Sequence, residues 1–307
     1  MPLEPLIIVN PVAGGGRAGR LVPWLRDRLS GASRGRLHVT ARAGEATDVA
    51  RDAARANVAR VVAVGGDGTV QEVVNGLLAA DGTNGSAPSL GIIPVGSGND
   101  LARSLRLPRA THIAYALATA GHARPIDVAR ASDRAGRSRW FASAGGIGFD
   151  AQVAAAMATR SGWQRGSVGY LLTTLSELRR FSNRHISLSL DGTATELDVL
   201  FVAFANGAYY GGGMRIAPDA RPDDGFLDVC VVGDVSRLTA IRQIPNLYRG
   251  THVSHRAVAV SRASRMTIEG GSDTLVHLDG EPFGSLPLDV ELVAGRLGIA
   301  SVAPAVR

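Results

Sequence analysis

The sequence predicts two domains, a doubly wound α/β domain followed by a β-rich domain. In the first third of the chain, short apolar runs alternate with segments of helical periodicity, which is the pattern of a parallel sheet covered by helices. From about Asp127 onward the pattern changes to mostly strands. The 307 residues are 45% hydrophobic and 20% charged, so the chain can bury two cores and wholesale disorder is excluded.

The first domain is predicted from four apolar runs and the segments between them. The runs indicate strands at residues 6–9, 37–40, 61–64 and 90–94. A fully apolar strand such as the third is typical of a parallel sheet that is covered on both faces. The helix after it repeats apolar residues at i, i+3, i+4, i+7 and i+8, through Val70, Val73, Val74, Leu77 and Leu78. This order of strands and helices favours a doubly wound sheet.

The second domain begins with a predicted helix at residues 149–180 and continues with strands. Asp191-Gly192 stands between two apolar runs and predicts a β-hairpin. Further strands are expected at residues 227–232, 257–260, 266–268, 275–278 and 288–293.

The basic residues limit the possible chemistry. All 33 of them are arginine, which excludes mechanisms that need a lysine amine, such as a Walker A loop or a Schiff base. The net charge of +6 favours anionic partners such as nucleotides or acidic lipid surfaces. Cys230 is the single cysteine, so we expect no internal disulfide, no cysteine zinc site and a cytoplasmic location.

No membrane-spanning segment is expected. The start of the chain, Met1-Pro2-Leu3-Glu4-Pro5, lacks the basic n-region of a signal peptide. No uninterrupted apolar run reaches the length of about 18 residues that spans a bilayer. Any contact with a membrane is therefore expected to be peripheral.

The most specific motif is Gly65-Gly66-Asp67-Gly68-Thr69, between a buried strand and an amphipathic helix. In that setting glycines let backbone N–H groups approach an anion, and the helix N-terminus adds its positive end. Thr69 is expected to be the N-cap, with Glu72 completing a capping box. The Asp67 carboxylate would repel a phosphate unless a cation or a hydroxyl proton lies between them. The alternative is a glycine-rich turn with an Asx cap.

A second loop of this kind, Gly96-Ser97-Gly98-Asn99-Asp100, follows the next strand. Its glycines allow close backbone approach, and Ser97 and Asn99 supply neutral polar groups. Alone it could be a simple helix cap. Two such loops at neighbouring strand ends predict a ligand crevice, because open α/β sheets bind ligands at the carboxyl ends of their strands.

The first loop, residues 10–19, fits the pattern G-x-G-x-x-G through Gly14, Gly16 and Gly19, so a dinucleotide-dependent dehydrogenase has to be considered. That class carries an acidic residue about 20 residues further on. Here the second strand ends at Thr40-Ala41-Arg42, without an acid. This reading is therefore disfavoured.

Two acidic clusters lie in the second domain. Residues 217–226 contain Asp219, Asp223 and Asp224 and could surround a hard cation, or form an ordinary acidic turn. His277-Leu278-Asp279-Gly280-Glu281 places two carboxylates at a strand end. One of them could be a general base that deprotonates a hydroxyl, although such a turn is more often only solvated.

Taken together, these motifs resemble the bacterial diacylglycerol kinase-type lipid kinases, which are related to the sphingosine kinases. The resemblance runs nearly end to end, in the family's order and spacing, through Asn10-Pro11 with Gly14, residues 65–69, 96–100, 211–218 and 223–225, and Asp279-Gly280-Glu281. It implies an α/β N-terminal doubly wound nucleotide-binding domain at residues 1–128, completed by 296–307. It also implies a β-rich sandwich C-terminal domain for the lipid substrate at residues 129–295.

The resemblance also implies ATP and Mg²⁺ as cofactors, and it assigns residues to them. Nucleotide contacts are implied for Asn10, Pro11, Val12, Ala13, Gly14, Thr40, Gly65, Gly66, Asp67, Gly68, Thr69, Val70, Gln71, Gly96, Ser97 and Asn99. A magnesium site is implied for the side chain of Asp224 with the backbone carbonyls of Arg221 and Phe226. Ala13 and Ser97 depart mildly from the family, which often has Ser and Thr there.

For the reaction, the resemblance implies phosphoryl transfer from Mg-ATP to a lipid hydroxyl, with diacylglycerol as the favoured acceptor and phosphatidic acid as the product. Glu281 would accept the proton, supported by Asp279, and Asp67 would organise magnesium and the phosphates. Lipid at the inner face of the membrane is the expected partner, a homodimer is a possibility left open, and no nucleic acid is expected. The alternatives are an NAD kinase-like enzyme, which shares the motif at residues 65–69, and a non-catalytic nucleotide or lipid sensor.

Overall fold

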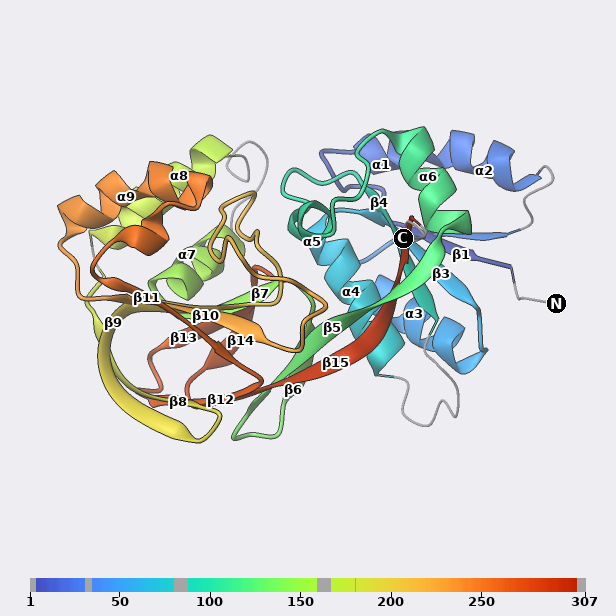
Figure 1. The fold of residues 1–307 in the computed structure, drawn as a ribbon. Coiled ribbons are helices and arrows are strands. Elements are labelled where there is room, and N and C mark those ends of the chain that lie inside the picture. Colours follow the sequence, from blue (N-terminus) through green and yellow to red (C-terminus); the bar gives the residue numbers. More distant parts are fainter. Residues whose placement is uncertain (1–3, 31–34, 80–87, 159–166, 180, 303–307) are drawn as a thin grey trace, which may run out of the picture. The chain divides into compact units, whose positions relative to one another are not determined.

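The computed structural model describes residues 4–30, 35–79, 88–158, 167–179 and 181–302 (Figure 1). The chain forms two compact units, Met1–Ile126 with Gly295–Arg307 and Asp127–Ala294. Strands β5 (His122–Asp133) and β15 (Leu288–Ser301) each run from one unit into the other. Within the described residues, no helix combines the length and the apolar character needed to cross a bilayer.

The sheet of the first unit is parallel and has the strand order β4-β3-β1-β2. At its β4 edge, Ile299 of β15 pairs in parallel with Leu90. The four strands are β1 Leu6–Val9, β2 Arg36–Val39, β3 Arg60–Gly65 and β4 Ser89–Pro94. The parallel strands predicted from the apolar runs are confirmed, and their carboxyl ends share one edge of the sheet.

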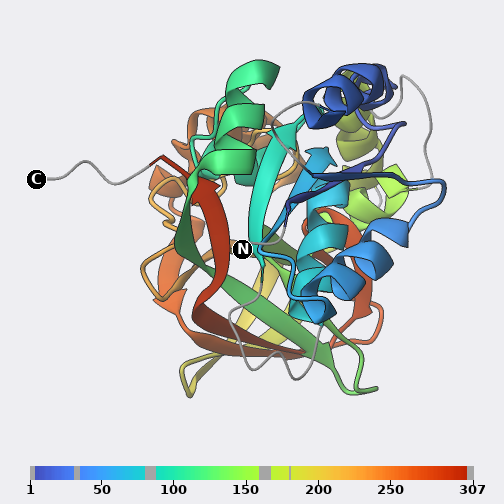
Figure 2. The same cartoon turned by 90° about the vertical axis from the view of Figure 1, so that its right-hand side faces the viewer.

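Helices cover both faces of this sheet, so the doubly wound α/β class is confirmed (Figures 1 and 2). They are α1 Arg17–Arg20, α2 Val22–Ser30, α3 Glu45–Arg55, α4 Asp67–Leu78, α5 Asp100–Ser104 and α6 Thr111–Ala120. On one face, Leu25 of α2 and Tyr115 of α6 pack against Ile7 and Val9 of β1. Alternate residues of a strand point to opposite faces, so the intervening Ile8 faces the other layer, where α3 and α4 lie.

The second unit is built from antiparallel strands in the order β14-β13-β7-β9-β8-β12-β15, and β10 pairs with β9 and β11. With β5 these are β6 Ser138–Phe141, β7 Ala144–Gly148, β8 Arg184–Leu190, β9 Thr193–Ala205, β10 Leu227–Gly233, β11 Val258–Ala263, β12 Arg265–Gly270, β13 Leu275–Leu278 and β14 Glu281–Ser285. The predicted hairpin is confirmed, because Leu190 pairs with Thr193 across Asp191-Gly192.

In the part of the second unit that the structure describes, there are three α-helices, α7 Phe149–Ala158, α8 Ser167–Leu178 and α9 Arg237–Arg249, and a short 3-10 helix, η2 His252–Ser254. The helix predicted at residues 149–180 corresponds to α7 and α8, while 159–166 and Arg180 lie outside the described residues. Helix α9 was not predicted. Ala240 and Leu247 pack against the core, but Leu238, Ile241 and Tyr248 are exposed on another side of the helix, so its apolar residues do not form the single core-facing stripe that identifies an amphipathic helix.

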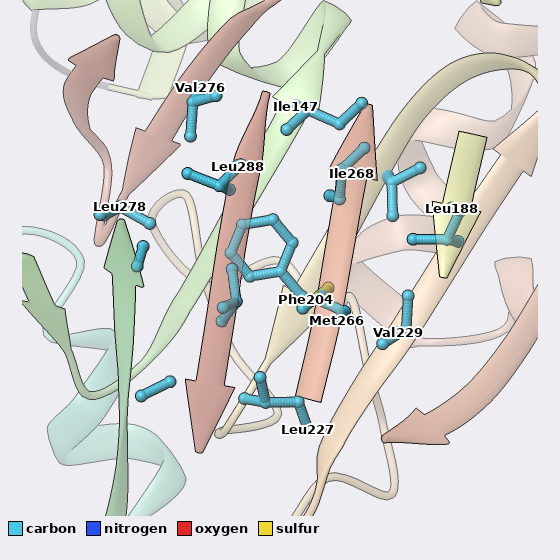
Figure 3. Packing of buried hydrophobic residues seen from close by; sticks show 14 of the residues in the cluster. Ile147, Leu188, Phe204, Leu227, Val229, Met266, Ile268, Val276, Leu278 and Leu288 are labelled. Atoms are coloured by element: carbon cyan, nitrogen blue, oxygen red, sulfur yellow. The ribbon is translucent and has the colours of Figure 1, made fainter. Parts of the chain in front are cut away.

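The core of the second unit lies between its strand layers (Figure 3). Phe204 of β9 is at its centre, with Met266 of β12, Leu278 of β13 and Leu288 of β15 around it. Fully burying an apolar side chain of this size stabilises a protein by about 1.5–3 kcal/mol. The next residue along β9, Ala205, belongs to a second apolar cluster on the opposite face of the strand. Strand β9 is therefore buried on both faces, which explains its nearly uninterrupted apolar sequence from residue 199.

Cys230 lies in that second cluster and is expected to be chemically inert in the folded protein. It is fully buried, and burial together with the charge of Asp150 raises its pKa to about 12. Because the thiolate is the reactive form, iodoacetamide at neutral pH should leave the native protein unmodified and alkylate it once after unfolding in guanidinium. Mass spectrometry would check this. Rapid alkylation of the native chain would show instead that β10 opens locally.

His252, beside Cys230, is expected to make stability depend on pH. It is 2% exposed, its Nε2 lies 3.1 Å from the Ile216 carbonyl oxygen, and burial lowers its pKa. In the unfolded chain His252 therefore takes up a proton near pH 6.5, whereas in the folded chain it does so only at lower pH. Stability is present above that pH and is lost as the pH falls below it, at no more than about 1.4 kcal/mol per pH unit.

Urea unfolding between neutral and mildly acidic pH would measure this slope. His252→Gln keeps a side-chain N–H donor but no longer titrates, so its slope should be smaller. His112→Gln, at an exposed position of α6, is the matched control and should keep the wild-type slope. Equal slopes in all three proteins would contradict the assignment.

Candidate functional site

The structure gathers the predicted nucleotide residues of the first unit along one edge of its sheet. Asn10 follows β1, Thr40 follows β2, and residues 65–69 and 95–99 follow β3 and β4. The backbone N–H of Thr40 donates to the Val9 carbonyl (2.9 Å), and that of Val95 donates to the Gly65 carbonyl (2.8 Å). The loops therefore leave the sheet from adjacent strand ends, as predicted.

Asp67 links the loop after β3 to the loop after β4. Its Oδ2 accepts a hydrogen bond from the backbone N–H of Asn99 (2.7 Å), and its Oδ1 accepts one from that of Asp100 (2.6 Å). Burial raises the pKa of the Asp67 carboxyl, and these N–H donors oppose the shift. Both carboxylate oxygens are thus used within the protein. The sequence did not show this role, because the partners are more than thirty residues away.

Thr69 is not the N-cap of the helix that follows it, contrary to the prediction. Helix α4 already begins at Asp67. The Thr69 hydroxyl instead accepts a hydrogen bond from Asn10 Nδ2 (3.1 Å), which ties the first loop to the second. Glu72 does not close a capping box either, since its carboxylate accepts from the Ala46 N–H at the start of α3 (3.2 Å).

Close backbone contacts explain several of the glycines. A Cβ added to Gly96 would lie 2.5 Å from the Cα of Gly66, and one added to Gly14 would lie 2.2 Å from the carbonyl oxygen of Val95. Arg17 Nη2 donates to that same carbonyl (2.8 Å), a contact that the sequence analysis missed. The three loops are therefore packed against one another through their backbones.

The other predicted residues of this edge differ in accessibility. Val12 is 76% exposed and Ser97 is exposed, so both can meet a ligand. The side chains of Thr40, Val70 and Gln71 are buried, and the Thr40 hydroxyl donates to the Val9 carbonyl (3.3 Å). Half-buried positions are Pro11, Ala13, Gly14, Gly66, Gly68 and Gly96, whereas Gly65 is buried at the end of β3.

In the second unit, Asp279 holds the segment between β6 and β7. Its carboxylate accepts hydrogen bonds from the backbone N–H groups of Ala142 (3.0 Å), Ser143 (2.9 Å) and Ala144 (3.0 Å). Its own N–H donates to the Ala144 carbonyl (2.8 Å). Asp279 is therefore a structural anchor of the Asp279-Gly280-Glu281 turn, consistent with a supporting rather than a reacting group.

Asn206, which no sequence pattern predicted, connects this turn to the acidic residues 217–226. It is fully buried, and its Nδ2 donates to the carbonyls of Ala142 (2.9 Å) and Asp127 (2.8 Å). The Asp127 carboxylate in turn accepts from the N–H of Gly225 (2.8 Å). A continuous set of hydrogen bonds thus runs from Asp279 to residue 225.

Glu281 is exposed at the first position of β14. Arg139 of β6 donates to the Pro282 carbonyl (3.0 Å), close by. Burial lowers the pKa of Arg139, and the charges of Glu281 and Asp279 oppose that shift. Glu281 therefore combines an accessible carboxylate with a fixed backbone and a neighbouring cation.

Beneath the turn lies a buried pair that the sequence analysis did not identify. His277 and Asp150 are nearly inaccessible, and His277 Nε2 lies 3.1 Å from Asp150 Oδ2. The N–H of Gly280 donates to His277 Nδ1 (3.3 Å), so the neutral ring carries its proton on Nε2 and donates to the carboxylate. Burial raises the pKa of Asp150, and the hydrogen bond from His277 opposes this.

Arg262 of β11 pairs with one aspartate of residues 217–226 and with one of β10. Asp224 Oδ2 accepts from Arg262 Nη2 (2.6 Å), and Asp228 Oδ1 lies 3.5 Å from Arg262 Nε. Burial raises the pKa of Asp228, Arg262 opposes the shift, and the charges of Asp224 and Asp219 add to it. Asp228 Oδ2 is buried and has no hydrogen-bond partner among the described residues.

These residues fit a magnesium ion that is bound in part by a substrate. Within the described residues no group of three or more acidic, histidine or cysteine side chains could hold a metal alone. Mg²⁺ commonly takes one or two carboxylates and completes its shell with phosphates and water. Asp224 supplies a carboxylate, and the buried Asp228 oxygen adds negative charge nearby. The other two predicted ligands are the backbone carbonyls of Arg221 and Phe226. The Arg221 side chain pairs with Asp223 (3.5 Å). The Phe226 side chain is 41% exposed, and the Arg262 guanidinium lies over its ring.

Two family models match consecutive parts of the chain. Residues 4–131 match the diacylglycerol kinase catalytic domain. Residues 143–301 match the YegS C-terminal NAD kinase beta sandwich-like domain. This confirms the β-sandwich class of the second unit.

Individual proteins are similar over nearly the full length. A diacylglycerol kinase of Mycobacterium tuberculosis is 33% identical over 298 residues, covering 95% of this chain and 93% of that protein. "Probable lipid kinase YegS-like" of Xanthomonas euvesicatoria is 33% identical, covering 85% and 84%. The crystal structure of a diacylglycerol kinase from Bacillus anthracis superposes with a TM-score of 0.73 at 26% identity, covering 99% of this chain and 98% of that one.

Proposed function

Because this chain belongs to the diacylglycerol kinase family of lipid kinases, we propose that it transfers the γ-phosphate of Mg-ATP to the hydroxyl of diacylglycerol, giving phosphatidic acid. The observation that carries the proposal is the Asp67 link between two glycine-rich loops. This link holds both loops at the carboxyl edge of a parallel sheet, where such folds bind phosphates.

In this proposal the first unit binds ATP. The loops that begin at Asn10, Gly65 and Val95 offer backbone N–H groups and the exposed Ser97 hydroxyl to the nucleotide. They need no lysine, in agreement with a chain whose basic residues are all arginine. Preorganised N–H donors stabilise the charge on a transferring phosphoryl group without rearranging during the reaction.

Magnesium would be held by Asp224 together with the backbone carbonyls of Arg221 and Phe226. When bound, it supplies neutralisation of phosphate charge. Arg262, which now engages Asp224, would have to share that carboxylate. The buried Asp228 oxygen keeps the local field negative and favours a cation there.

Glu281 would accept the proton of the acceptor hydroxyl. The hydroxyl oxygen forms a bond to the γ-phosphorus, the bond from that phosphorus to the β–γ bridging oxygen breaks, and ADP leaves with that electron pair. The hydroxyl proton passes to the Glu281 carboxylate. Asp279 holds the turn in place through its three backbone partners and takes no proton itself.

Because diacylglycerol resides in a bilayer, we further propose that the enzyme works peripherally at the inner face of the membrane. The net charge of +6 supports contact with anionic lipid headgroups.

Phosphate transfer from labelled Mg-ATP to a panel of acceptors in mixed micelles tests the function. The panel contains diacylglycerol, a sphingoid base, phosphatidylglycerol and a polyisoprenol, with NAD as a soluble control. Label in diacylglycerol alone is the expected result. Label in another lipid would keep the lipid kinase and correct the acceptor, whereas label only in NAD would overturn the proposal. Binding of ATP without any transfer would indicate a sensor instead.

A further inference from the structure

Helix α9 turns apolar side chains toward the solvent. Leu238, Ile241 and Tyr248 are exposed by 56%, 40% and 42%, and Pro245 between them is also exposed. Single exposed apolar residues are common on protein surfaces. Here, however, four of them recur at spacings of three or four residues on one helix, which places them on one side.

The inner side of α9 already has its partner. Ala240 and Leu247 pack against the second apolar cluster of the second unit, and no residue of the helix is fully buried. The helix lies on the outside of that unit (Figure 1). Its outward apolar residues therefore leave a large part of their surface in contact with solvent.

Arginines border this apolar stripe on both sides. At about 100° per residue, Leu238, Ile241, Pro245 and Tyr248 fall within an arc of roughly 80°. Arg237 lies just beyond one edge of the arc, and Arg242 and Arg249 lie just beyond the other. All three are exposed, and the helix contains no acidic residue. We call these seven residues the α9 face.

We propose that the α9 face docks the protein onto the surface of an anionic bilayer. Apolar side chains flanked by arginine are the composition of a helix that lies in a membrane interface. Leu238 and Ile241 would enter the boundary between headgroups and acyl chains, and Tyr248 suits the headgroup level. The arginines would extend to lipid phosphates while their aliphatic stems stay on the apolar side. The choice of a bilayer as partner rests on the proposed lipid kinase function.

The charges disfavour a second copy of the chain as the occupant. A two-fold symmetric dimer through α9 would bring its three arginines against the same three of the partner. The acidic residue that precedes the helix, Asp234, supplies one negative charge against three arginines and therefore does not balance them. A surface of anionic phosphates satisfies both the apolar stripe and its borders.

Vesicle cosedimentation tests this directly. The full chain is mixed with vesicles of phosphatidylcholine alone, or of equal parts phosphatidylcholine and phosphatidylglycerol, at low and at high salt. Binding should require phosphatidylglycerol and weaken with salt. The triple variant R237Q/R242Q/R249Q should bind about a hundredfold more weakly, since each arginine near an anionic surface contributes a factor of about five. The double variant L238Q/I241Q should also lose most of its binding.

Matched controls change the same charge or the same apolar character elsewhere. R55Q/R134Q/R265Q removes three arginines that are also more than half exposed. L275Q replaces an exposed leucine of β13. These variants should bind anionic vesicles within about threefold of wild type, allowing for the change in overall charge. If they lose as much binding as the α9 variants, overall charge rather than the α9 face governs binding, and the proposal is overturned.

The remaining outcomes separate the docking surface from the catalytic proposal. Phosphorylation of a short-chain soluble diacylglycerol should be equal in wild type and α9 variants, while phosphorylation of vesicle-embedded diacylglycerol should fall in the variants. Vesicle binding that depends on α9 without any lipid phosphorylation would overturn the function but support docking. Unchanged vesicle binding in the α9 variants overturns docking, and a dimer that these variants dissociate would then identify α9 as a contact between copies.

Discussion

Glu281→Gln is expected to lower the turnover number by about 10² to 10⁴-fold with the fold intact. Glutamine fills the same volume but cannot accept the hydroxyl proton, and removal of a general base costs a factor of this size. The side chain is exposed, so the free energy of unfolding should change by no more than about 0.5 kcal/mol. Initial-rate kinetics and urea unfolding of the same preparation would measure both quantities.

Two further substitutions make this result specific. Glu291→Gln, at an exposed position of β15, is the matched control and should leave turnover unchanged. Asp279→Asn should reduce stability as well as turnover, because an amide nitrogen would face backbone N–H groups that now donate to a carboxylate. A loss of activity with unchanged stability is therefore expected for Glu281 and not for Asp279.

Retained turnover in Glu281→Gln would move the role of base to another carboxylate. Asp67 is the other carboxylate that the family resemblance places at the reaction, but both of its oxygens accept hydrogen bonds from backbone N–H groups.

Local patterns predicted the parts of this fold that local physics determines. Apolar runs gave β1, β3 and β4 to within a residue or two, and Asp191-Gly192 gave the β8–β9 hairpin because both positions need positive φ, which these residue types tolerate. The placement of the glycine-rich loops followed from the same signals. Parallel strands bring their carboxyl ends to one edge, so loops far apart in sequence could be expected to meet.

Strand β7 shows where such patterns fail. Its sequence, Ala144-Gly145-Gly146-Ile147-Gly148, has little strand propensity. The glycines are needed because a Cβ at Gly145 would lie 2.1 Å from the ring of Phe204, and one at Gly146 would lie 2.1 Å from the Asp150 carboxylate. The pairing with β9 and β13 imposes this strand from outside, so tertiary packing overrides propensity.

The hydrogen bonds of the site were not predictable for a related reason. Asp150 and His277 are 127 residues apart, and Asp279 and Ala142 are 137 apart. Hydrophobic periodicity reports on neighbours within one helix or strand and cannot predict a contact across so many residues. A single sequence shows that Asp67 is an unusual residue in an anion-binding loop, but only the structure shows which N–H groups its carboxylate holds.

Asp67→Asn is the second change expected to have a large effect, and it should act through the loops. The amide offers one acceptor where two backbone N–H groups now donate, at 2.7 and 2.6 Å, and its NH₂ group would face the other donor. Losing a charge-assisted hydrogen bond and leaving a buried donor unpaired should lower the free energy of unfolding by about 2–4 kcal/mol. Displaced loops should also raise the KM for ATP and lower turnover by about 10²-fold, because positioning errors near 1 Å cost that much.

The pattern of losses distinguishes the two roles that Asp67 could have. If its carboxylate links the loops, stability and nucleotide affinity fall together in urea unfolding and in ATP titration. If it acts on magnesium and the phosphates, as the family resemblance implies, turnover falls while unfolding is unchanged. Asp52→Asn, on the exposed side of α3 with 77% of its side chain accessible, is the control and should alter neither. If Asp67→Asn matches the wild type in urea unfolding, ATP titration and turnover, both roles are contradicted.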